Sequence, residues 1–209
     1  MLKIGYVDED EGQRNSFYHF LKDDFEVVLI DITEDTNVEN LVDEIIKSGL
    51  DVLVLDYMLS ENGLVEFNAE SLVDTIYEIN KHYPLVILTS HETDALDQIA
   101  NAHLINGKDD MLGQKLPIFK QKLTKIAIEY KNEIKNSEAE LKDLENKRLS
   151  KGLSAAEEDR YVELNSFLDM TVDSKGRVSR TFYSEETNKK LDNLIDLAEK
   201  MLKKLPDKE

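Results

Sequence analysis

The chain has 209 residues, a net charge of −18 and no cysteine. This length suits one large domain or one domain with an appendage, and a chain without cysteine forms neither disulfides nor thiolate metal sites. Residues 1–115 contain 25 Asp and Glu against 7 Lys and Arg, which gives 7 − 25 = −18, whereas residues 116–209 contain 19 of each. The acidic first part argues against binding of nucleic acid or an anionic membrane through that surface, and it favours a cation or a basic partner.

The start of the chain gives no sign of a targeting segment. Met1-Leu2-Lys3 leads directly into a strand-like run without the pattern of a signal peptide. No apolar stretch approaches the roughly 18–20 residues that span a bilayer. We therefore expect a cytoplasmic protein without a membrane partner.

Residues 1–116 alternate between two kinds of hydrophobic pattern. Apolar runs predict five strands, at 3–7, 25–31, 51–55, 85–89 and 102–106. Between them, apolar residues at helical spacing predict helices at 11–22, 37–48, 69–82 and about 92–102. Such alternation is typical of right-handed crossovers and a parallel sheet covered on both faces. We expect residues 1–116 to form an α/β domain with a five-stranded, doubly wound parallel sheet.

From Pro117 onward the pattern is helical. Residues spaced three or four apart form a stripe like that of a coiled coil: Ile126, Tyr130, Ile134, Ser137, Leu141 and Leu144. The stripe predicts one long helix over 117–149, and a capping-box pattern at Ser154 and Glu157 predicts the start of a second, over 155–169. A polar loop over 171–183 and a helix over 185–205 complete the expected all-α extension, residues 117–209, which we interpret as a hairpin or bundle.

Polar side chains stand at the ends of three predicted strands. Asp8 and Glu9 follow the first strand, Asp56 follows the third, and Thr89 ends the fourth. Because the carboxyl ends of parallel strands meet at one edge of a sheet, these groups predict an acidic pocket for a divalent cation and a phosphoryl group. Taken alone, Asp56 could equally be a carboxylate that caps the loop after its strand.

Four motifs in this order resemble response-regulator receiver domains over about residues 1–115. They are Val7-Asp8-Glu9, Leu55-Asp56-Tyr57-Met58-Leu59, Leu88-Thr89-Ser90 and a lysine after the fifth strand. The resemblance implies that Asp56 accepts a phosphoryl group from a histidine kinase or phosphotransfer protein, which would make the chain a phosphoprotein of a two-component phosphorelay. It also implies a Mg²⁺ site formed by Asp8, Glu9, Asp56 and the backbone carbonyl of Met58, with Thr89 binding a phosphoryl oxygen.

Two lysines are candidates for the conserved position that the resemblance implies. Lys108 directly follows the predicted fifth strand, and we favour it. Lys115 is the alternative, because its segment echoes the family pattern around the lysine; choosing it would move the strand to about 110–112. The chain departs from the family in having Ile105 or Met111 where an aromatic switch residue is usual.

These features together predict a response regulator whose output passes through protein–protein contacts of the helices over 117–205, either with a partner or by self-association. Nucleic acid is not expected, because the extension has no net charge and no helix-turn-helix signature. Any chemistry would be at most self-phosphorylation and autodephosphorylation at Asp56. The alternative is a catalytically silent receiver-like scaffold or docking subunit of a multiprotein complex, such as a defence complex. A Mg²⁺-dependent phosphohydrolase is a weaker hypothesis, because Met58 stands where a second aspartate would be needed.

Overall fold

The structure is a computed structural model, and it describes residues 1–172 of the chain. The helix expected over 185–205 lies outside the described residues, as does nearly all of the loop expected over 171–183. The chain divides into two compact units, Met1–Glu133 and a second unit that begins at Ile134.

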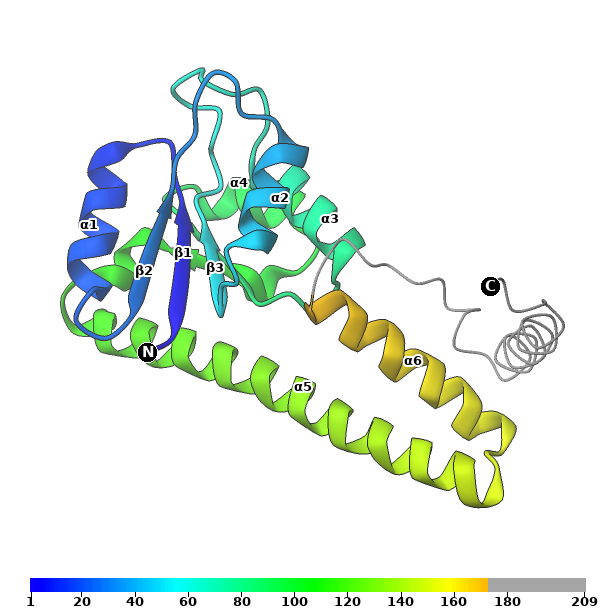
Figure 1. The fold of residues 1–209 in the computed structure, drawn as a ribbon. Coiled ribbons are helices and arrows are strands. Elements are labelled where there is room, and N and C mark those ends of the chain that lie inside the picture. The colour runs from blue at the N-terminus through cyan, green and yellow to red at the C-terminus, as the bar shows by residue number, and fades with distance from the viewer. Residues whose placement is uncertain (173–209) are drawn as a thin grey trace, which may run out of the picture. The chain divides into compact units, whose positions relative to one another are not determined.

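The first unit contains a sheet of five parallel strands (Figure 1). The strands are β1 (Lys3–Val7), β2 (Glu26–Ile30), β3 (Val52–Leu55), β4 (Leu85–Thr89) and β5 (Ile105–Gly107). Their spatial order is β2-β1-β3-β4-β5, the flavodoxin-like arrangement. Every residue of β3 and β4 is buried, as expected for central strands covered on both faces. The predicted doubly wound α/β fold is confirmed, and it is consistent with a receiver-like domain.

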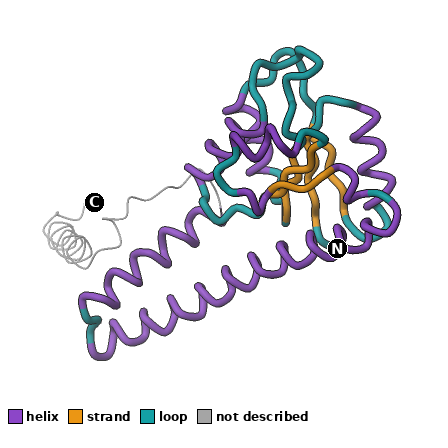
Figure 2. The backbone as a smooth tube through the Cα atoms, turned by 180° about the vertical axis from the view of Figure 1, so that it is seen from behind, coloured by secondary structure: helices purple, strands orange, loops and turns teal. Residues whose placement is uncertain are grey.

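Helices cover both faces of this sheet (Figure 2). They are α1 (Glu11–Leu21), α2 (Val38–Lys47), α3 (Ala69–Ile79), α4 (Glu92–Gln98) and the first part of α5 (Leu116–Lys151). On one face, side chains of α1 and α5 pack against the strands, among them Tyr6, Phe17, Val54, Phe119 and Leu123. On the other, α2, α3 and α4 pack against the opposite side chains, among them Leu41, Leu53, Leu72, Ile87 and Ala95. The alternation of side chains along each strand therefore divides the core into two layers.

The segment between β4 and β5 differs from the sequence-based expectation. Helix α4 ends at Gln98 instead of near residue 102, and Ala102–Leu104 forms a 3₁₀ turn where the fifth strand was expected to begin. The side chain of Asn101 accepts the backbone N–H of His103 at 3.2 Å. Such a local side-chain bond competes with helix and strand hydrogen bonding, which explains the late start of β5.

Helix α3 also ends early, at Ile79 instead of residue 82. Asn80 has extended backbone angles and a buried side chain. Its Nδ2 donates to the Tyr130 hydroxyl at 2.8 Å, and its Oδ1 accepts the N–H of His82 at 3.0 Å. The helix stops here because Asn80 serves two partners outside it.

The first unit includes the first half of α5 and does not stop at residue 116. Phe119, Leu123 and Ala127 are buried in the same core layer as Phe17 of α1. These contacts make the start of α5 an integral part of the α/β unit, which extends through Glu133.

The described part of the second unit is an antiparallel hairpin, as predicted. The end of α5 is followed by Gly152, with φ of 76°, and then by α6 (Ala155–Val172). Arg160 donates two hydrogen bonds to Glu140, at 2.9 and 2.8 Å, and further ion pairs join Arg148 to Glu158 and Lys147 to Glu157. The Ser154–Glu157 pair forms hydrogen bonds at the start of α6, as its capping-box pattern predicted.

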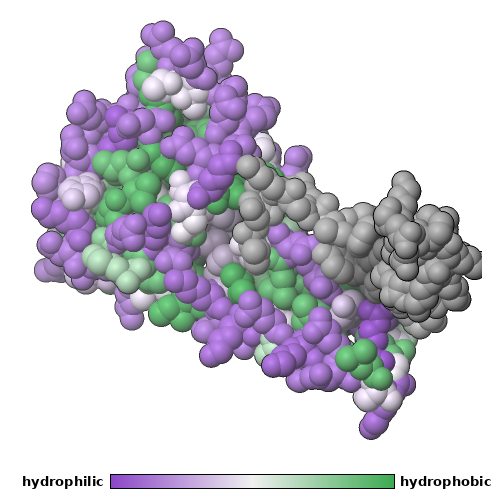
Figure 3. Space-filling model, in the orientation of Figure 1, coloured by the Kyte–Doolittle hydropathy of each residue, from purple (hydrophilic) through white to green (hydrophobic). Residues whose placement is uncertain are grey.

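Hydrophilic side chains cover most of the molecular face drawn in Figure 3, interrupted by smaller apolar areas. Within residues 1–172, none of the helices combines the length and the apolar character that a membrane-spanning segment needs.

Candidate functional site

Three carboxylates meet at the carboxyl edge of the sheet. Asp8 and Glu9 follow β1 and Asp56 follows β3, and these two strands are adjacent, with the N–H of Asp56 bonded to the carbonyl of Val7 at 2.8 Å. One oxygen from each carboxylate lies within 4.8 Å of the others. Asp8 and Asp56 are buried and Glu9 is half-buried. This acidic cluster could bind a metal ion and is compatible with Mg²⁺, which prefers oxygen ligands.

Lys108 places one positive charge against two members of the acidic cluster. It directly follows β5, and its Nζ lies 3.0 Å from Asp8 Oδ2 and 3.0 Å from Asp56 Oδ1. Burial by itself lowers the pKa of Lys108, but the carboxylates of Asp56 and Asp8 outweigh burial and raise it. Burial raises the pKa of Asp56, and the charge of Lys108 opposes this shift. The ammonium therefore stays charged, and it is the group that makes two buried carboxylates tolerable.

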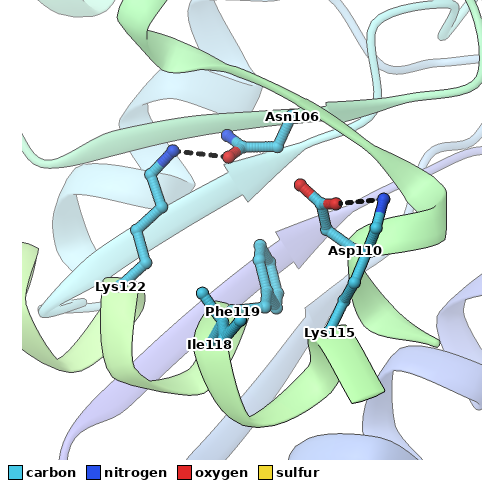
Figure 4. Close-up of a pocket in the computed structure, with 6 residues that line it drawn as sticks. All are labelled: Asn106, Asp110, Lys115, Ile118, Phe119 and Lys122. Carbon is cyan, nitrogen blue, oxygen red and sulfur yellow. Dashed lines mark hydrogen bonds and ion pairs between the residues drawn. The ribbon is translucent and has the colours of Figure 1, made fainter. Parts of the chain in front are cut away.

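Lys115, the alternative lysine, lies elsewhere. Its Nζ pairs with Asp110 at 3.1 Å, and its side chain is exposed. Both residues line a hollow of about 330 Å³ beside β5 and α5. Lys122 lines it as well and donates to Asn106 at 2.5 Å (Figure 4). The structure thus brings Lys108, and not Lys115, to Asp8 and Asp56.

Glu9 has an orphaned oxygen. Its Oε2 is buried without a hydrogen-bond partner among the described residues. Burial, followed by the nearby charges of Asp8 and Asp56, raises the pKa of Glu9 to about 7. A buried carboxylate oxygen without a donor is unfavourable unless a proton or a cation reaches it. The donor set and this unsatisfied atom fit a hard divalent cation.

Thr89 ends β4, the strand that pairs with β3, and Met58 follows Asp56 by two residues. Thr89 is buried at the end of β4, and its Oγ1 accepts the N–H of His91 at 2.9 Å, which leaves the hydroxyl proton to be donated elsewhere. The N–H of Met58 donates to Asp56 Oδ2 at 3.3 Å. The carbonyl of Met58, which the resemblance assigns to the metal, accepts a turn hydrogen bond from the N–H of Glu61 at 3.3 Å.

Two contacts of Asp8 were not expected from the sequence. The hydroxyl of Tyr6 donates to Asp8 Oδ2 at 2.5 Å, and Arg14 donates to the backbone carbonyl of Asp8 at 2.6 Å. The contact between Tyr6 and Asp8 could have been predicted from their spacing, because residues two apart in a strand point to the same side. Arg14 gave no such signal, because its approach depends on how α1 leaves the loop after β1.

Comparison with protein-family models and with curated proteins finds no match for this chain. The site is therefore interpreted from its own geometry: two buried carboxylates, a half-buried third and a lysine at one edge of a parallel sheet.

Proposed function

We propose that this chain is a receiver protein of the response-regulator type that accepts a phosphoryl group on Asp56 in a two-component phosphorelay. The observation that supports the proposal is the convergence of Asp56, Asp8, Glu9 and Lys108 at the carboxyl edge of the sheet. In this class the donor is a histidine kinase or a phosphotransfer protein, which presents a phosphoimidazole.

The proposed transfer is a nucleophilic displacement at phosphorus. An oxygen of Asp56 forms a new P–O bond while the P–N bond of the donor breaks, and the imidazole leaves with the electron pair and takes up a proton from solvent. Asp56 then carries an acyl phosphate. Before transfer, the ammonium of Lys108 lies 3.0 Å from Asp56 Oδ1. After transfer it can pair with one phosphoryl oxygen, and the Thr89 hydroxyl can donate to another.

Asp8, Glu9 and Asp56 are the residues that would hold Mg²⁺. When bound, the ion supplies positive charge that reduces the repulsion between the Asp56 carboxylate and the phosphoryl group. Lys108 alone leaves three carboxylates opposed by one ammonium, so the donor set calls for a second cation.

The proposed output is a protein–protein contact of the helical extension over 117–205, with a partner or with a second copy. The hairpin of the second unit carries charges of both signs in internal ion pairs, in contrast to the basic surface typical of DNA-binding regions. Removing residues 134–209 should abolish association, measured by light scattering or partner capture, and leave phosphorylation intact. Unchanged association would contradict the proposed output.

One observation favours a second candidate, a silent receiver-like scaffold. Asp56 is only 3% exposed, and its two oxygens are engaged by Lys108 and by the N–H of Met58. Phosphoryl transfer therefore requires local opening of these contacts, whereas a docking subunit would need none.

Phosphorylation by a small phosphodonor separates the two candidates. Wild type incubated with phosphoramidate and Mg²⁺ should gain one phosphoryl group by intact mass, and Asp56→Ala should gain none. Asp51→Asn is the matched control, because Asp51 precedes the same strand, β3, at its other end. It should behave as wild type. The proposed phosphoacceptor role is refuted if wild type gains no mass at any Mg²⁺ concentration, or if Asp56→Ala gains as much.

A further inference from the structure

Tyr6 brings a hydroxyl from the core to a carboxylate of the acidic cluster. The residue is the next to last of β1 and is fully buried. Its ring stacks on Phe17 of α1, with centroids 4.0 Å apart and planes inclined by 11°. Held in this way, the hydroxyl has little freedom to turn from Asp8 Oδ2, to which it donates at 2.5 Å.

The bond from the Tyr6 hydroxyl to Asp8 Oδ2 is short. O–H···O contacts of about 2.5–2.7 Å are typical of a hydroxyl that donates to a carboxylate. The phenol is the donor of this pair, because a carboxylate only accepts hydrogen bonds. Asp8 is thus a buried carboxylate that receives a neutral donor from the side of the core.

Asp8 is held from three directions. Its Oδ2 accepts from the Tyr6 hydroxyl and from Lys108, and its Oδ1 accepts the backbone N–H of Asp10 at 2.8 Å. A carboxylate has about four acceptor positions, so one remains for a further ligand. Two of the three donors, Tyr6 and the backbone of Asp10, belong to the rigid core and to the cap of α1. They fix the plane of the carboxylate independently of Lys108.

We propose that Tyr6 is a positioning residue for cation binding: its hydroxyl fixes the Asp8 carboxylate in the orientation that a divalent ion requires. The inference rests on the proposed function only in taking Asp8 as a ligand of Mg²⁺. Groups that hydrogen-bond to a metal ligand orient it, and removing one typically lowers metal affinity about 10- to 100-fold. Tyr6→Phe keeps the ring and its stacking on Phe17 and removes only the hydroxyl.

A purely structural role of Tyr6 predicts something different. If the residue served only to fill the core, Tyr6→Phe would change stability and leave Mg²⁺ affinity unaltered. Tyr83 provides a matched control, because it is also buried, its hydroxyl has no hydrogen-bond partner among the described residues, and it precedes β4 at the opposite edge of the sheet. Tyr83→Phe removes the same atom far along the strands from the acidic cluster.

The test is Mg²⁺ titration of the full chain by calorimetry, with wild type, Tyr6→Phe and Tyr83→Phe compared at one pH. We expect Tyr6→Phe to bind Mg²⁺ about 10- to 100-fold more weakly and Tyr83→Phe to bind as wild type does. Equal affinity of Tyr6→Phe and wild type, or no Mg²⁺ binding by wild type, overturns the proposal. Phosphorylation by phosphoramidate is measured separately. If Tyr6→Phe binds Mg²⁺ more weakly than wild type does, but wild type never gains a phosphoryl group, the role of Tyr6 is supported and the proposed function is refuted.

A second measurement uses wild type alone and so does not depend on the folding of a variant. The Tyr6 hydroxyl proton, buried and bonded to a carboxylate, should give a slowly exchanging downfield proton resonance with contacts to the Phe17 ring. Binding of Mg²⁺ is followed to saturation through the backbone amide resonance of Asp56. It should shift the Tyr6 hydroxyl resonance, because Asp8, the acceptor of that proton, becomes a metal ligand. A resonance that does not move at saturation overturns the proposal.

Discussion

Replacement of Glu9 by glutamine should stabilise the protein in the absence of divalent cations. The folded protein raises the pKa of Glu9 to about 7 from an ordinary value of 4.5, chiefly because the group is buried and then because Asp8 and Asp56 are near. Below pH 4.5 the carboxyl is protonated in both the folded and the unfolded chain, and it costs nothing. As the pH rises from 4.5 to 7 the unfolded chain releases its proton first, so the free energy of unfolding falls.

The size of the effect follows from the gap between the two pKa values. A gap of about 2.5 units corresponds to at most about 3.4 kcal/mol, at about 1.36 kcal/mol per unit. Glu9 is only half-buried, and solvent screening reduces the figure to about 1–2 kcal/mol. More than half of this decrease in the free energy of unfolding should occur between about pH 5.5 and 8.5. This range lies above the isoelectric point, which is near 4.6.

The assay is urea unfolding followed by circular dichroism, in EDTA, at pH 5.5 and 8.5. Glu9→Gln should exceed wild type in stability at pH 8.5 and by clearly less at pH 5.5. The exposed Glu61, in the loop after Asp56, supplies the control, and Glu61→Gln should follow wild type at both pH values. Excess Mg²⁺ should reverse the order: at 100 times its Kd an ion adds about 2.7 kcal/mol to wild type, and the variant lacks one of its ligands. A Glu9→Gln variant that is no more stable than wild type at pH 8.5 in EDTA would refute this reasoning.

Three further predictions concern the lysine, the sheet and the boundary of the first unit. Lys108→Met should lower the free energy of unfolding by about 3 kcal/mol in EDTA, because it leaves the carboxylates of Asp8 and Asp56 buried without the ammonium that pairs with them. Lys115 belongs to an exposed ion pair, so Lys115→Met should have no measurable effect in the same urea assay. Gly5→Ala should lower the free energy of unfolding by about 1–3 kcal/mol, because a Cβ at Gly5 would come within 2.2 Å of Leu50 Cδ1. Leu50→Ala should relieve this clash. A double-mutant cycle that shows no coupling between the two positions would contradict the prediction. A fragment of residues 1–133 should unfold cooperatively, and a fragment of residues 1–116 should not, because the shorter one loses the buried Phe119, Leu123 and Ala127. If circular dichroism shows that the 1–116 fragment is folded, α5 is dispensable for the first unit and the prediction is wrong.

The sequence was most informative where burial is complete. The runs at 52–55 and 85–88 consist of apolar residues alone, and they form the central strands β3 and β4 within one residue of the expected bounds. A strand covered on both faces must be apolar throughout, so the pattern leaves few alternatives. The approach of Asp8, Glu9 and Asp56 was predicted from the same strands, because Asp8 and Glu9 come after β1 and Asp56 comes directly after β3.

The sequence was less informative where side-chain hydrogen bonds decide the backbone. Asn80 and Asn101 ended helices or delayed a strand through bonds to Tyr130 and His103, and hydrophobic periodicity does not register such bonds. For a related reason the sequence pattern placed the end of the α/β domain at residue 116, whereas the compact unit runs through Glu133. The stripe along α5 continues from a core-facing segment into the hairpin, and the pattern alone does not distinguish burial against a sheet from burial against a second helix.

The charges at the carboxyl edge of the sheet connect stability with the proposed function. When all four groups are ionised, Asp8, Glu9 and Asp56 oppose Lys108 alone, which leaves an excess of two negative charges in a region shielded from water. A proton on Glu9 removes one of these charges, and a divalent cation would offset both. The folded chain thus tolerates a destabilising cluster that a hydrophobic or neutral substitution would relieve. Such a conflict is typical of sites kept for binding or chemistry, so Glu9→Gln should gain stability in EDTA and lose Mg²⁺ affinity at the same time.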